Sequence, residues 1–280
     1  MRLLSYRIGE TARYGAVVDG GLVDLVSRVG DRWPTLRAAI AADALPALAA
    51  IAAAARPDHH LEDVAFAPII PDPDKILCVG LNYRSHASEV GRELPAHPSV
   101  FARLHNTLVA HGGDILRPRA SVNLDFEGEL AVIIDRHCRH VPVEAALSVV
   151  AGYSCFNDAS VRDFQRHSVT AGKNFPCTGA LGPWMVTSDE ISDPQTLHLV
   201  TRLNGTAVQD DTTDHMIYPV ARIIAYLSTF TTLEAGDVIA TGTPAGVGLG
   251  RDPPLWMKAG DTIEVDIAGI GTLRNRIVDE

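Results

Sequence analysis

The chain has 280 residues, of which 46% are hydrophobic and 21% are charged, and this composition excludes a disordered or collagen-like protein. Its 24 basic and 34 acidic residues give a net charge of −10, and the basic residues are scattered. Neither a nucleic acid nor an anionic membrane surface is therefore an expected partner. The longest apolar run is interrupted, so we expect no transmembrane helix.

The cysteines indicate a reducing compartment. Cys78, Cys138, Cys155 and Cys177 form no CxxC pair, and their spacing suits neither a zinc site nor a disulfide framework. The N-terminal stretch meets charged residues too early for a secretory apolar core. We therefore expect free thiols and a cytoplasmic location.

Residues 1–72 predict a small N-terminal α/β domain. Apolar and polar positions alternate over 1–30 around Asp19-Gly20-Gly21, which is typical of a β-hairpin. Residues 35–56 are rich in Ala and Leu and predict a helix that is interrupted at Pro46. Prolines cluster between 57 and 73, which places the domain boundary near residue 72.

Residues 73–280 predict a larger, β-rich domain with a few helices, so the fold class is mainly β with some α. The apolar patterns predict strands at 76–80, 124–134, 237–242 and 261–278, a helical turn at 144–151, a hairpin at 198–210 that turns at Asn204-Gly205, and a helix at 218–233.

The segment D-F-E-G-E-L-A carries two glutamates with one residue between them. Side chains two apart on a strand point to the same face, so Glu127 and Glu129 would stand side by side. Two adjacent carboxylates resist ionising unless a cation compensates them. Because an apolar run follows, the pair would lie at the mouth of a core and suit Mg²⁺, Mn²⁺ or Ca²⁺. The alternative is a solvated edge strand.

Asp158, Arg162 and Gln165 lie in the segment N-D-A-S-V-R-D-F-Q. Asp158 is a good N-cap for a helix that begins at Ala159, and a cap position can also belong to a site. Arg162 and Gln165 are three residues apart and would share a helical face, where they could hold a substrate carboxylate or carbonyl. Arg162 could equally pair with a nearby aspartate.

Lysine occurs three times in the chain, and Lys173 stands in a loop bounded by Gly and Pro. Its compact charge could stabilise a developing oxyanion, or it could be a solvated loop lysine. Thr243 lies in T-G-T-P-A-G-V-G, where the glycines allow close backbone approach and Thr243 offers a hydroxyl and an amide to a carboxylate. A plain tight turn is the alternative there.

His86 and Glu89 are three residues apart and would meet on one helical turn. A carboxylate that holds an imidazole fixes its tautomer and raises its basicity, which suits a general base for water. An exposed His–Glu pair of little energetic weight is the alternative.

The order of these segments resembles the fumarylacetoacetate hydrolase family over about residues 75–280. The motifs are G-L-N-Y-R-S-H-A-S-E from Gly80, D-F-E-G-E-L-A from Asp125, N-D-A-S-V-R-D-F-Q from Asn157, G-K-N-F with the later L-G-P-W, and T-G-T-P-A-G-V-G from Thr241. The resemblance implies a mixed β-sandwich roll that forms a homodimer and binds Mg²⁺ or Mn²⁺.

The resemblance also implies roles for individual residues. It implies metal ligands at Glu127, Glu129 and Asp158, a lid dyad at His86 and Glu89, an oxyanion-stabilising Lys173, and substrate contacts at Tyr83, Arg162, Gln165 and Thr243.

The implied activity is hydrolysis of a C–C bond in a 2,4-dioxo acid of the acylpyruvate type through a metal-bound enolate, in aromatic or sugar-acid catabolism. The same enolate chemistry without water attack gives an oxaloacetate-type decarboxylase or a 2-hydroxyhepta-2,4-diene-1,7-dioate-type isomerase. A non-catalytic protein that binds a small 2-oxo acid on the same fold is an alternative of another class.

Overall fold

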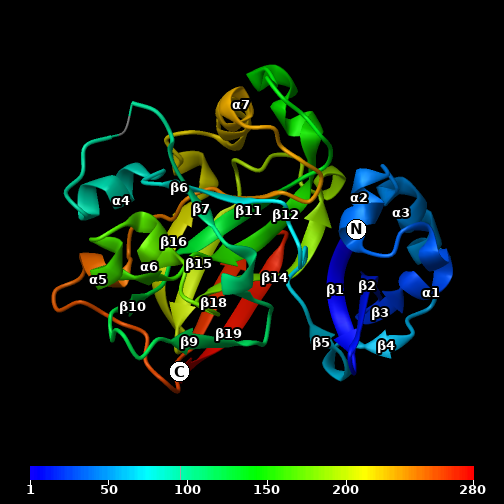
Figure 1. Ribbon diagram of the computed structural model, residues 1–280, viewed down its shortest axis with the longest axis horizontal. Helices are drawn as coiled ribbons and strands as arrows, with labels where there is room; N and C mark the ends of the chain where they lie inside the picture. Colours follow the sequence, from blue (N-terminus) through cyan, green and yellow to red (C-terminus); the bar gives the residue numbers. More distant parts are fainter. Residues whose placement is uncertain (95) are drawn as a thin grey trace.

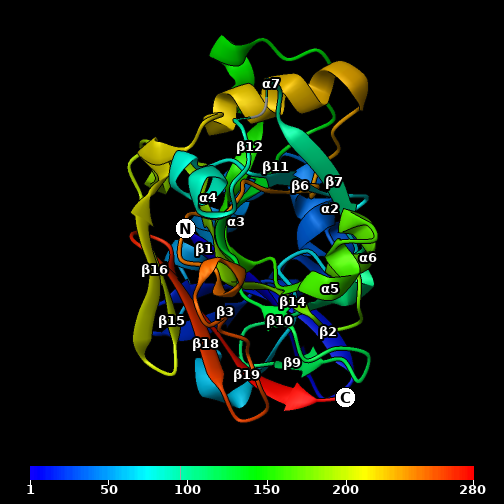
Figure 2. The ribbon, with the colours of Figure 1, turned by 90° about the vertical axis from the view of Figure 1, so that its left-hand side faces the viewer.

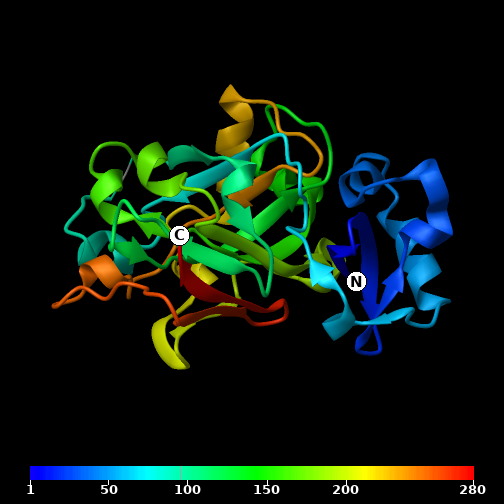
Figure 3. The same cartoon turned by 60° about the horizontal axis from the view of Figure 1, so that its bottom comes forward.

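The computed structural model describes residues 1–94 and 96–280. An N-terminal unit lies to one side of a larger β-rich body (Figures 1 and 3). The N-terminal unit contains β1 (Arg2–Ile8), β2 (Thr11–Val18), β3 (Gly21–Asp24), β4 (His59–His60), β5 (Ala65–Phe66), α1 (Val26–Val29), α2 (Leu36–Ala41), α3 (Leu45–Ala53) and the 3-10 turns η1 (Gly30–Arg32) and η2 (Leu61–Asp63).

The local patterns of the N-terminal unit were predictable. The β2–β3 hairpin turns at Asp19 and Gly20, whose positive φ angles of 49° and 76° suit a tight hairpin turn. The expected helix over 35–56 is two helices, because the chain turns at 42–44, where Asp43 has a φ of 52°. Pro46 lies in the first turn of α3, where a missing N–H costs nothing.

The largest sheet runs through both parts of the chain. Its strand order is β4-β3-β2-β1-β14-β12-β11-β17-β6-β7, and β1 pairs with β14 through Arg2 opposite Val186. The N-terminal strands therefore extend the sheet of the body, and a domain division at residue 72 stays a prediction. The strands of the body in this sheet are β6 (Ile76–Gly80), β7 (Ser99–Arg103), β8 (Leu108–Val109), β11 (Gly128–Ile134), β12 (Val150–Asn157), β14 (Gly179–Thr187) and β17 (Val238–Ala240).

A second sheet packs against the first and closes the roll (Figure 2). Its strand order is β16-β15-β18-β19-β9, and the β15–β16 hairpin turns at Asn204-Gly205 as predicted. Its strands are β9 (Asp114–Arg117), β15 (His198–Leu203), β16 (Thr206–Thr212), β18 (Thr262–Ile267) and β19 (Gly271–Asp279). A separate two-stranded sheet is formed by β10 (Leu124–Asp125) and β13 (Ser160–Val161).

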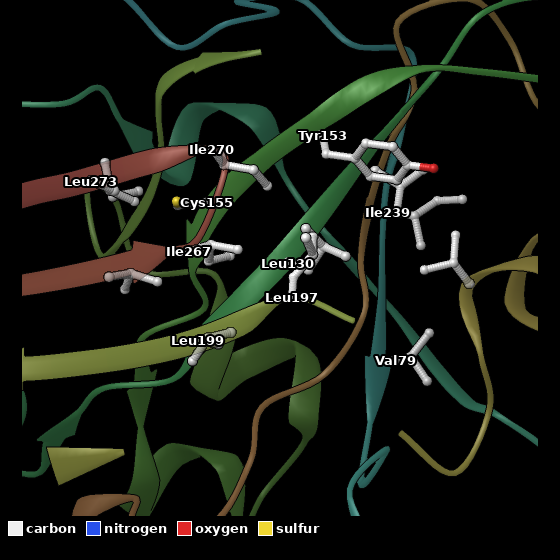
Figure 4. Close-up of a cluster of buried hydrophobic side chains, with 14 of the residues drawn as sticks. Val79, Leu130, Tyr153, Cys155, Leu197, Leu199, Ile239, Ile267, Ile270 and Leu273 are labelled. Carbon is white, nitrogen blue, oxygen red and sulfur yellow. The ribbon is translucent and has the colours of Figure 1, made fainter. Parts of the chain in front are cut away.

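The apolar run of β11 is buried on both faces. Alternate side chains point to opposite sides of a strand, so Leu130 and Val132 enter the core between the two sheets, whereas Ala131 and Ile133 face a second cluster shared with the N-terminal unit. Figure 4 shows the first core, in which Leu130 and Leu199 are both labelled. This burial explains why the strand sequence is continuously apolar.

Helices and 3-10 turns complete the body. The predicted helix over 218–233 is α7 (Val220–Phe230), and it packs on η4 (Val143–Val149). The remaining elements are α4 (Arg84–Glu89), α5 (Arg162–Gln165), α6 (Val169–Lys173), η3 (His105–Thr107), η5 (Ser188–Glu190), η6 (Thr213–His215) and η7 (Gly248–Gly250). Along the described chain, every helix is too short or too polar to cross a bilayer.

Three local predictions were wrong. The strand expected over 261–278 is a hairpin, because the chain turns at residues 268–270 and β18 pairs antiparallel with β19. The strand expected over 124–134 is broken, since β10 ends at Asp125 and the carboxylate of Asp125 accepts the N–H of Phe126. Asp158 is not a helix N-cap, because the chain continues in extended form through β13 and the helix begins at Arg162. Its carboxylate binds cationic side chains instead.

Candidate active site

Three carboxylates meet where β11 and β12 lie side by side. Glu127 comes just before β11, Glu129 lies on it, and Asp158 follows β12. The backbone N–H of Asp158 donates to the carbonyl of Glu127 at 2.9 Å, which holds the two segments in register. One carboxylate oxygen from each residue lies within 4.8 Å of the others, and all three residues are buried.

Buried cations compensate two of the three carboxylates. Lys173 Nζ lies 2.6 Å from Glu127 Oε2 and 2.7 Å from Asp158 Oδ2. Arg162 Nη2 lies 2.8 Å from Glu127 Oε1, and Arg103 Nη1 lies 2.5 Å from Asp158 Oδ1. Burial opposes ionisation of Glu127, but the positive charges of Lys173 and Arg162 outweigh it and lower its pKa to about 2.

Glu129 is the carboxylate without a cationic partner among the described residues. Its Oε2 accepts the backbone N–H of Gly242 at 2.7 Å. Burial, together with the negative charges of Asp158 and Glu127, raises the pKa of Glu129 well above its usual range. Ionisation of Glu129 beside two other acids would therefore need another positive charge nearby.

The donor set fits a hard divalent cation. Three carboxylates provide oxygen ligands, which Mg²⁺, Mn²⁺ and Ca²⁺ prefer. With Asp125, which pairs with Arg162, the cluster has four buried acids but three buried bases, which are Arg103, Arg162 and Lys173. Ionisation of all four acids would leave one negative charge without a compensating base. The uncompensated Glu129 is the observation that favours a bound cation.

The histidine–glutamate pair lies on α4, at the wall of the same cavity. His86 Nδ1 lies 3.3 Å from Glu89 Oε2, while Glu89 Oε1 accepts the backbone N–H of Gly246 at 2.9 Å. His86 is buried and lines the cavity together with Glu127 and Glu129. Since Glu89 holds Nδ1, the other ring nitrogen, Nε2, is the one that can face a ligand.

A cavity of about 500 Å³ joins these groups. Arg162, Gln165, Lys173 and Thr243 line it, as do Glu127, Glu129 and His86, whereas Asp158 and Glu89 lie behind the wall. Tyr83 does not reach the cavity; it is fully buried in the main core, beside α4.

Lys173 lies deeper than a loop lysine. It is the last residue of α6, its side chain is buried, and its ammonium contacts Glu127 Oε2, Asp158 Oδ2 and the carbonyl of Asp158. The contacts with Glu127 Oε2 and the carbonyl of Asp158 are hydrogen bonds, whereas the contact with Asp158 Oδ2 is an ion pair without hydrogen-bond geometry. Two of the three donors of the ammonium are therefore used in hydrogen bonds within residues 1–94 and 96–280.

Two site residues, Arg103 and Asp125, were not recognised from the sequence. Arg103 is fully buried and binds Asp158. A glycine is needed beside it at position 179, because a Cβ at Gly179 would lie 2.5 Å from Arg103 Cζ. No motif surrounds Arg103, so the sequence gives no signal for it. Asp125 was visible at the head of the D-F-E-G-E motif; it accepts from Arg162 Nε at 2.7 Å and from the N–H of Gly248.

Buried ionisable groups with shifted pKa values around a cavity are typical of an enzyme active site. The chain belongs to the fumarylacetoacetate hydrolase family, since the family described as "Fumarylacetoacetate (FAA) hydrolase C-terminal" matches residues 75–278. This membership confirms the family and the enzyme class that the motifs indicated.

Known proteins resemble the chain over most of its length. Oxaloacetate tautomerase YisK of Bacillus subtilis is 42% identical over 226 residues, which are 78% of this chain and 75% of that protein. The fumarylacetoacetate hydrolase of Exiguobacterium antarcticum has a TM-score of 0.84 and 33% identity, with all of both chains covered. Maleylpyruvate hydrolase from Sphingobium sp. SYK-6, solved with manganese(II) ion and pyruvate, has a TM-score of 0.83 and 28% identity, with 100% of this chain and 99% of that one covered. The predicted fold class is confirmed.

Proposed function

We propose that the protein is a metal-dependent hydrolase that cleaves a C–C bond in a 2,4-dioxo acid of the acylpyruvate type. The observation that carries the proposal is the uncompensated, buried Glu129, which lines a cavity together with Glu127 and the His86 side chain. The structural relative solved with manganese and pyruvate, a maleylpyruvate hydrolase, supports the same chemistry.

Glu127, Glu129 and Asp158 would hold the metal ion, Mg²⁺ or Mn²⁺, with Ca²⁺ as a further candidate. The bound ion would act as a Lewis acid and stabilise negative charge on the oxygens of a 2-oxo acid. Lys173 and Arg162 keep Glu127 ionised, and Arg103 neutralises the far side of Asp158, so that the carboxylates are ready as ligands.

His86 is the proposed base. With Nδ1 held by Glu89, Nε2 can take a proton from a water molecule that attacks the carbonyl two carbons beyond the keto group. The overall reaction is acylpyruvate plus water to pyruvate plus a carboxylic acid. Lys173, which donates two hydrogen bonds, would stabilise the oxyanion of this attack through its charge.

The substrate would be oriented by groups on the cavity wall. Arg162 is fixed by Asp125 and by Gln165, whose Oε1 accepts from Arg162 at 2.8 Å, so the amide nitrogen of Gln165 is the group that can donate to a substrate oxygen. The hydroxyl of Thr243 donates to the carbonyl of Gly128, so its backbone N–H is the proposed contact with a substrate carboxylate.

A second candidate is an enzyme of oxaloacetate, a tautomerase or decarboxylase, and the 42% identity to an oxaloacetate tautomerase favours it. In the tautomerase, His86 would move a proton between carbon and oxygen of the same substrate. In the decarboxylase, the C–C bond to the carboxylate two carbons from the keto carbon would break, so that CO₂ leaves and the pyruvate enolate takes up a proton. Water attacks no carbonyl in either reaction. The two candidates share the acid cluster and differ in the use of water.

A substrate panel distinguishes them. Acetylpyruvate, oxaloacetate and a hydroxymuconate-type diacid are assayed with Mg²⁺ and with Mn²⁺, and with a chelator as the control. Our proposal predicts metal-dependent release of pyruvate and a carboxylic acid in equal amounts from acetylpyruvate. Accelerated keto–enol conversion of oxaloacetate, or release of CO₂ and pyruvate from it, with no pyruvate released from any acylpyruvate, would favour the second candidate instead.

A further inference from the structure

Gln209 carries a buried amide just behind the wall of the cavity. It lies on β16 of the second sheet, and its side chain is almost completely buried. Its Oε1 accepts the backbone N–H of Gly128 at 2.9 Å, while its Nε2 donates to Thr243 Oγ1 at 2.8 Å and to the carbonyl of Pro244 at 2.9 Å. Both amide hydrogens are therefore used, and the side chain is held in one orientation.

Hydrogen bonds between Gln209, Thr243 and Gly128 form a closed ring. Because Gln209 Nε2 can only donate, the single hydroxyl hydrogen of Thr243 is free for another acceptor, and it goes to the carbonyl of Gly128 at 2.9 Å. The ring thus holds both backbone polar groups of Gly128, the residue between Glu127 and Glu129. Since Thr243 lines the cavity, the amide of Gln209 sets the position of the cavity wall relative to the acid cluster.

A β-bulge in β16 directs Gln209 to this place. The register with β15 shifts by one residue between Ala207 and Gln209, so that Val208 is the extra residue. Consecutive side chains of a regular strand point to opposite faces, whereas Val208 and Gln209 are both buried. Bulges turn side chains in this way and are frequent beside active sites.

The same bulge supports the loop 241–246 at a second point. The carbonyl of Val208 accepts from Arg251 Nη2 at 2.7 Å, and Arg251 also donates to the carbonyl of Gly246. A Cβ at Gly246 would clash with the oxygen of Val208, so this close approach requires a glycine. The N–H of Gly246 in turn donates to Glu89, the partner of His86.

The loop would keep its other attachments without the amide of Gln209. The N–H of Gly242 donates to Glu129 Oε2, and Arg251 holds the carbonyl of Gly246. Loss of the amide would therefore free Thr243 and leave the carboxylate of Glu129 with its own partner. The expected defect is in the binding of a ligand at Thr243, with the metal ligands largely unchanged.

We propose that Gln209 is a positioning residue, which holds the backbone of Thr243 in place for the carboxylate of a 2-oxo acid. The inference rests on the proposed function, because it takes the N–H of Thr243 to bind that carboxylate. Gln209 itself lies behind Thr243 and would act on the ligand through it.

Binding of pyruvate tests the positioning role without any turnover. Gln209→Met keeps the length of the side chain and removes its three hydrogen bonds. In titration calorimetry with saturating Mn²⁺, we expect the affinity for pyruvate to fall at least about tenfold. The affinity for Mn²⁺, titrated separately, should change less than about threefold.

Thr243→Val breaks the same ring from the other side. It removes the hydroxyl and keeps the backbone N–H, so it should weaken pyruvate binding to a similar degree. The double variant should lose little more than either single variant, because both changes open one ring. If thermal unfolding shows that Gln209→Met is not folded, Thr243→Val decides the question, and an unchanged affinity for pyruvate in it overturns the proposal.

Asn275→Leu is the matched control. Asn275 is as buried as Gln209, and its Nδ2 donates to the carbonyls of Ala110 and Gly113 at 2.8 and 2.9 Å, away from the residues that line the cavity. The variant removes buried hydrogen bonds of the same kind, so it should lower Tm. Its affinity for pyruvate should equal that of the wild-type protein.

The other outcomes overturn the positioning role and leave the proposed function standing. They are an unchanged affinity for pyruvate in folded Gln209→Met, an equal loss in Asn275→Leu, additive losses in the double variant, and a loss of Mn²⁺ affinity as large as that of pyruvate affinity. Failure of pyruvate to bind the wild-type protein with saturating Mn²⁺ refutes the proposed function, and the inference falls with it.

Discussion

Replacing Arg103 by methionine removes the cation that compensates the far side of Asp158. Both side chains are fully buried, and the guanidinium also donates to Thr178 Oγ1 at 2.8 Å and to the carbonyl of Ala159 at 3.1 Å. Breaking a buried pair by removing one partner costs about 3–5 kcal/mol, because a charge is left without compensation. For a chain of this size the loss corresponds to a fall in Tm of roughly 6–12 °C.

The assay is thermal unfolding followed by circular dichroism in a chelator, so that no added metal ion compensates Asp158. Arg276→Met is the control, since Arg276 forms an ion pair with Asp114 that is exposed on both sides and screened by water. We expect the control to shift Tm by less than about 2 °C. An equal shift in the two variants would refute the view that Arg103 is an obligatory partner of the acid cluster.

Three further predictions concern the site. His86→Ala should abolish hydrolysis of an acylpyruvate while Mn²⁺ affinity changes by less than about twofold, because an imidazole that acts as base is no ligand; a variant with full turnover would remove His86 from the mechanism. Lys173→Met should lower kcat more than it raises KM. It should also shift the pH midpoint of Mn²⁺ binding upward, because loss of the ammonium lets the pKa of Glu127 rise from about 2. An unchanged pH midpoint of Mn²⁺ binding would contradict this expectation. Burial and neighbouring acids raise the pKa of Glu129, so the folded, metal-free protein keeps a proton that the unfolded chain releases from about pH 4.5. The free energy of unfolding of the metal-free protein should therefore fall as pH rises from 4.5 through the raised pKa. The urea midpoint of the wild-type protein should show this fall, whereas that of Glu129→Gln should not. Parallel pH profiles of the two proteins would contradict the prediction.

Local signals were sufficient for several elements of the fold. Asn204-Gly205 takes the positive φ angles of 52° and 78° that a two-residue hairpin requires, and the helical apolar pattern placed α7 correctly. The motif order was sufficient for the family, because each motif fixes residue types at set spacings. Both kinds of signal lie within short stretches of sequence.

The remaining features depend on contacts between distant segments. The break before β11 coincides with bonds that the sequence cannot reveal, since Gly128 donates to the side chain of Gln209 and Glu127 to that of Asn157. The role of Arg103 became visible through its burial against Asp158. Pairing of β1 with β14 likewise joins residues more than 180 positions apart, for which no local pattern exists.

The central claim is that Glu127, Glu129 and Asp158 bind one divalent cation. Mn²⁺ titration of the metal-free protein, followed by electron paramagnetic resonance of the free ion, tests it directly, with Glu129→Gln as the variant and Glu144→Gln, an exposed acid on η4, as the control. We predict one bound ion per chain and a loss of affinity of more than about 100-fold in Glu129→Gln, with no change in the control. Equal Mn²⁺ affinity in Glu129→Gln and the wild-type protein would contradict the account.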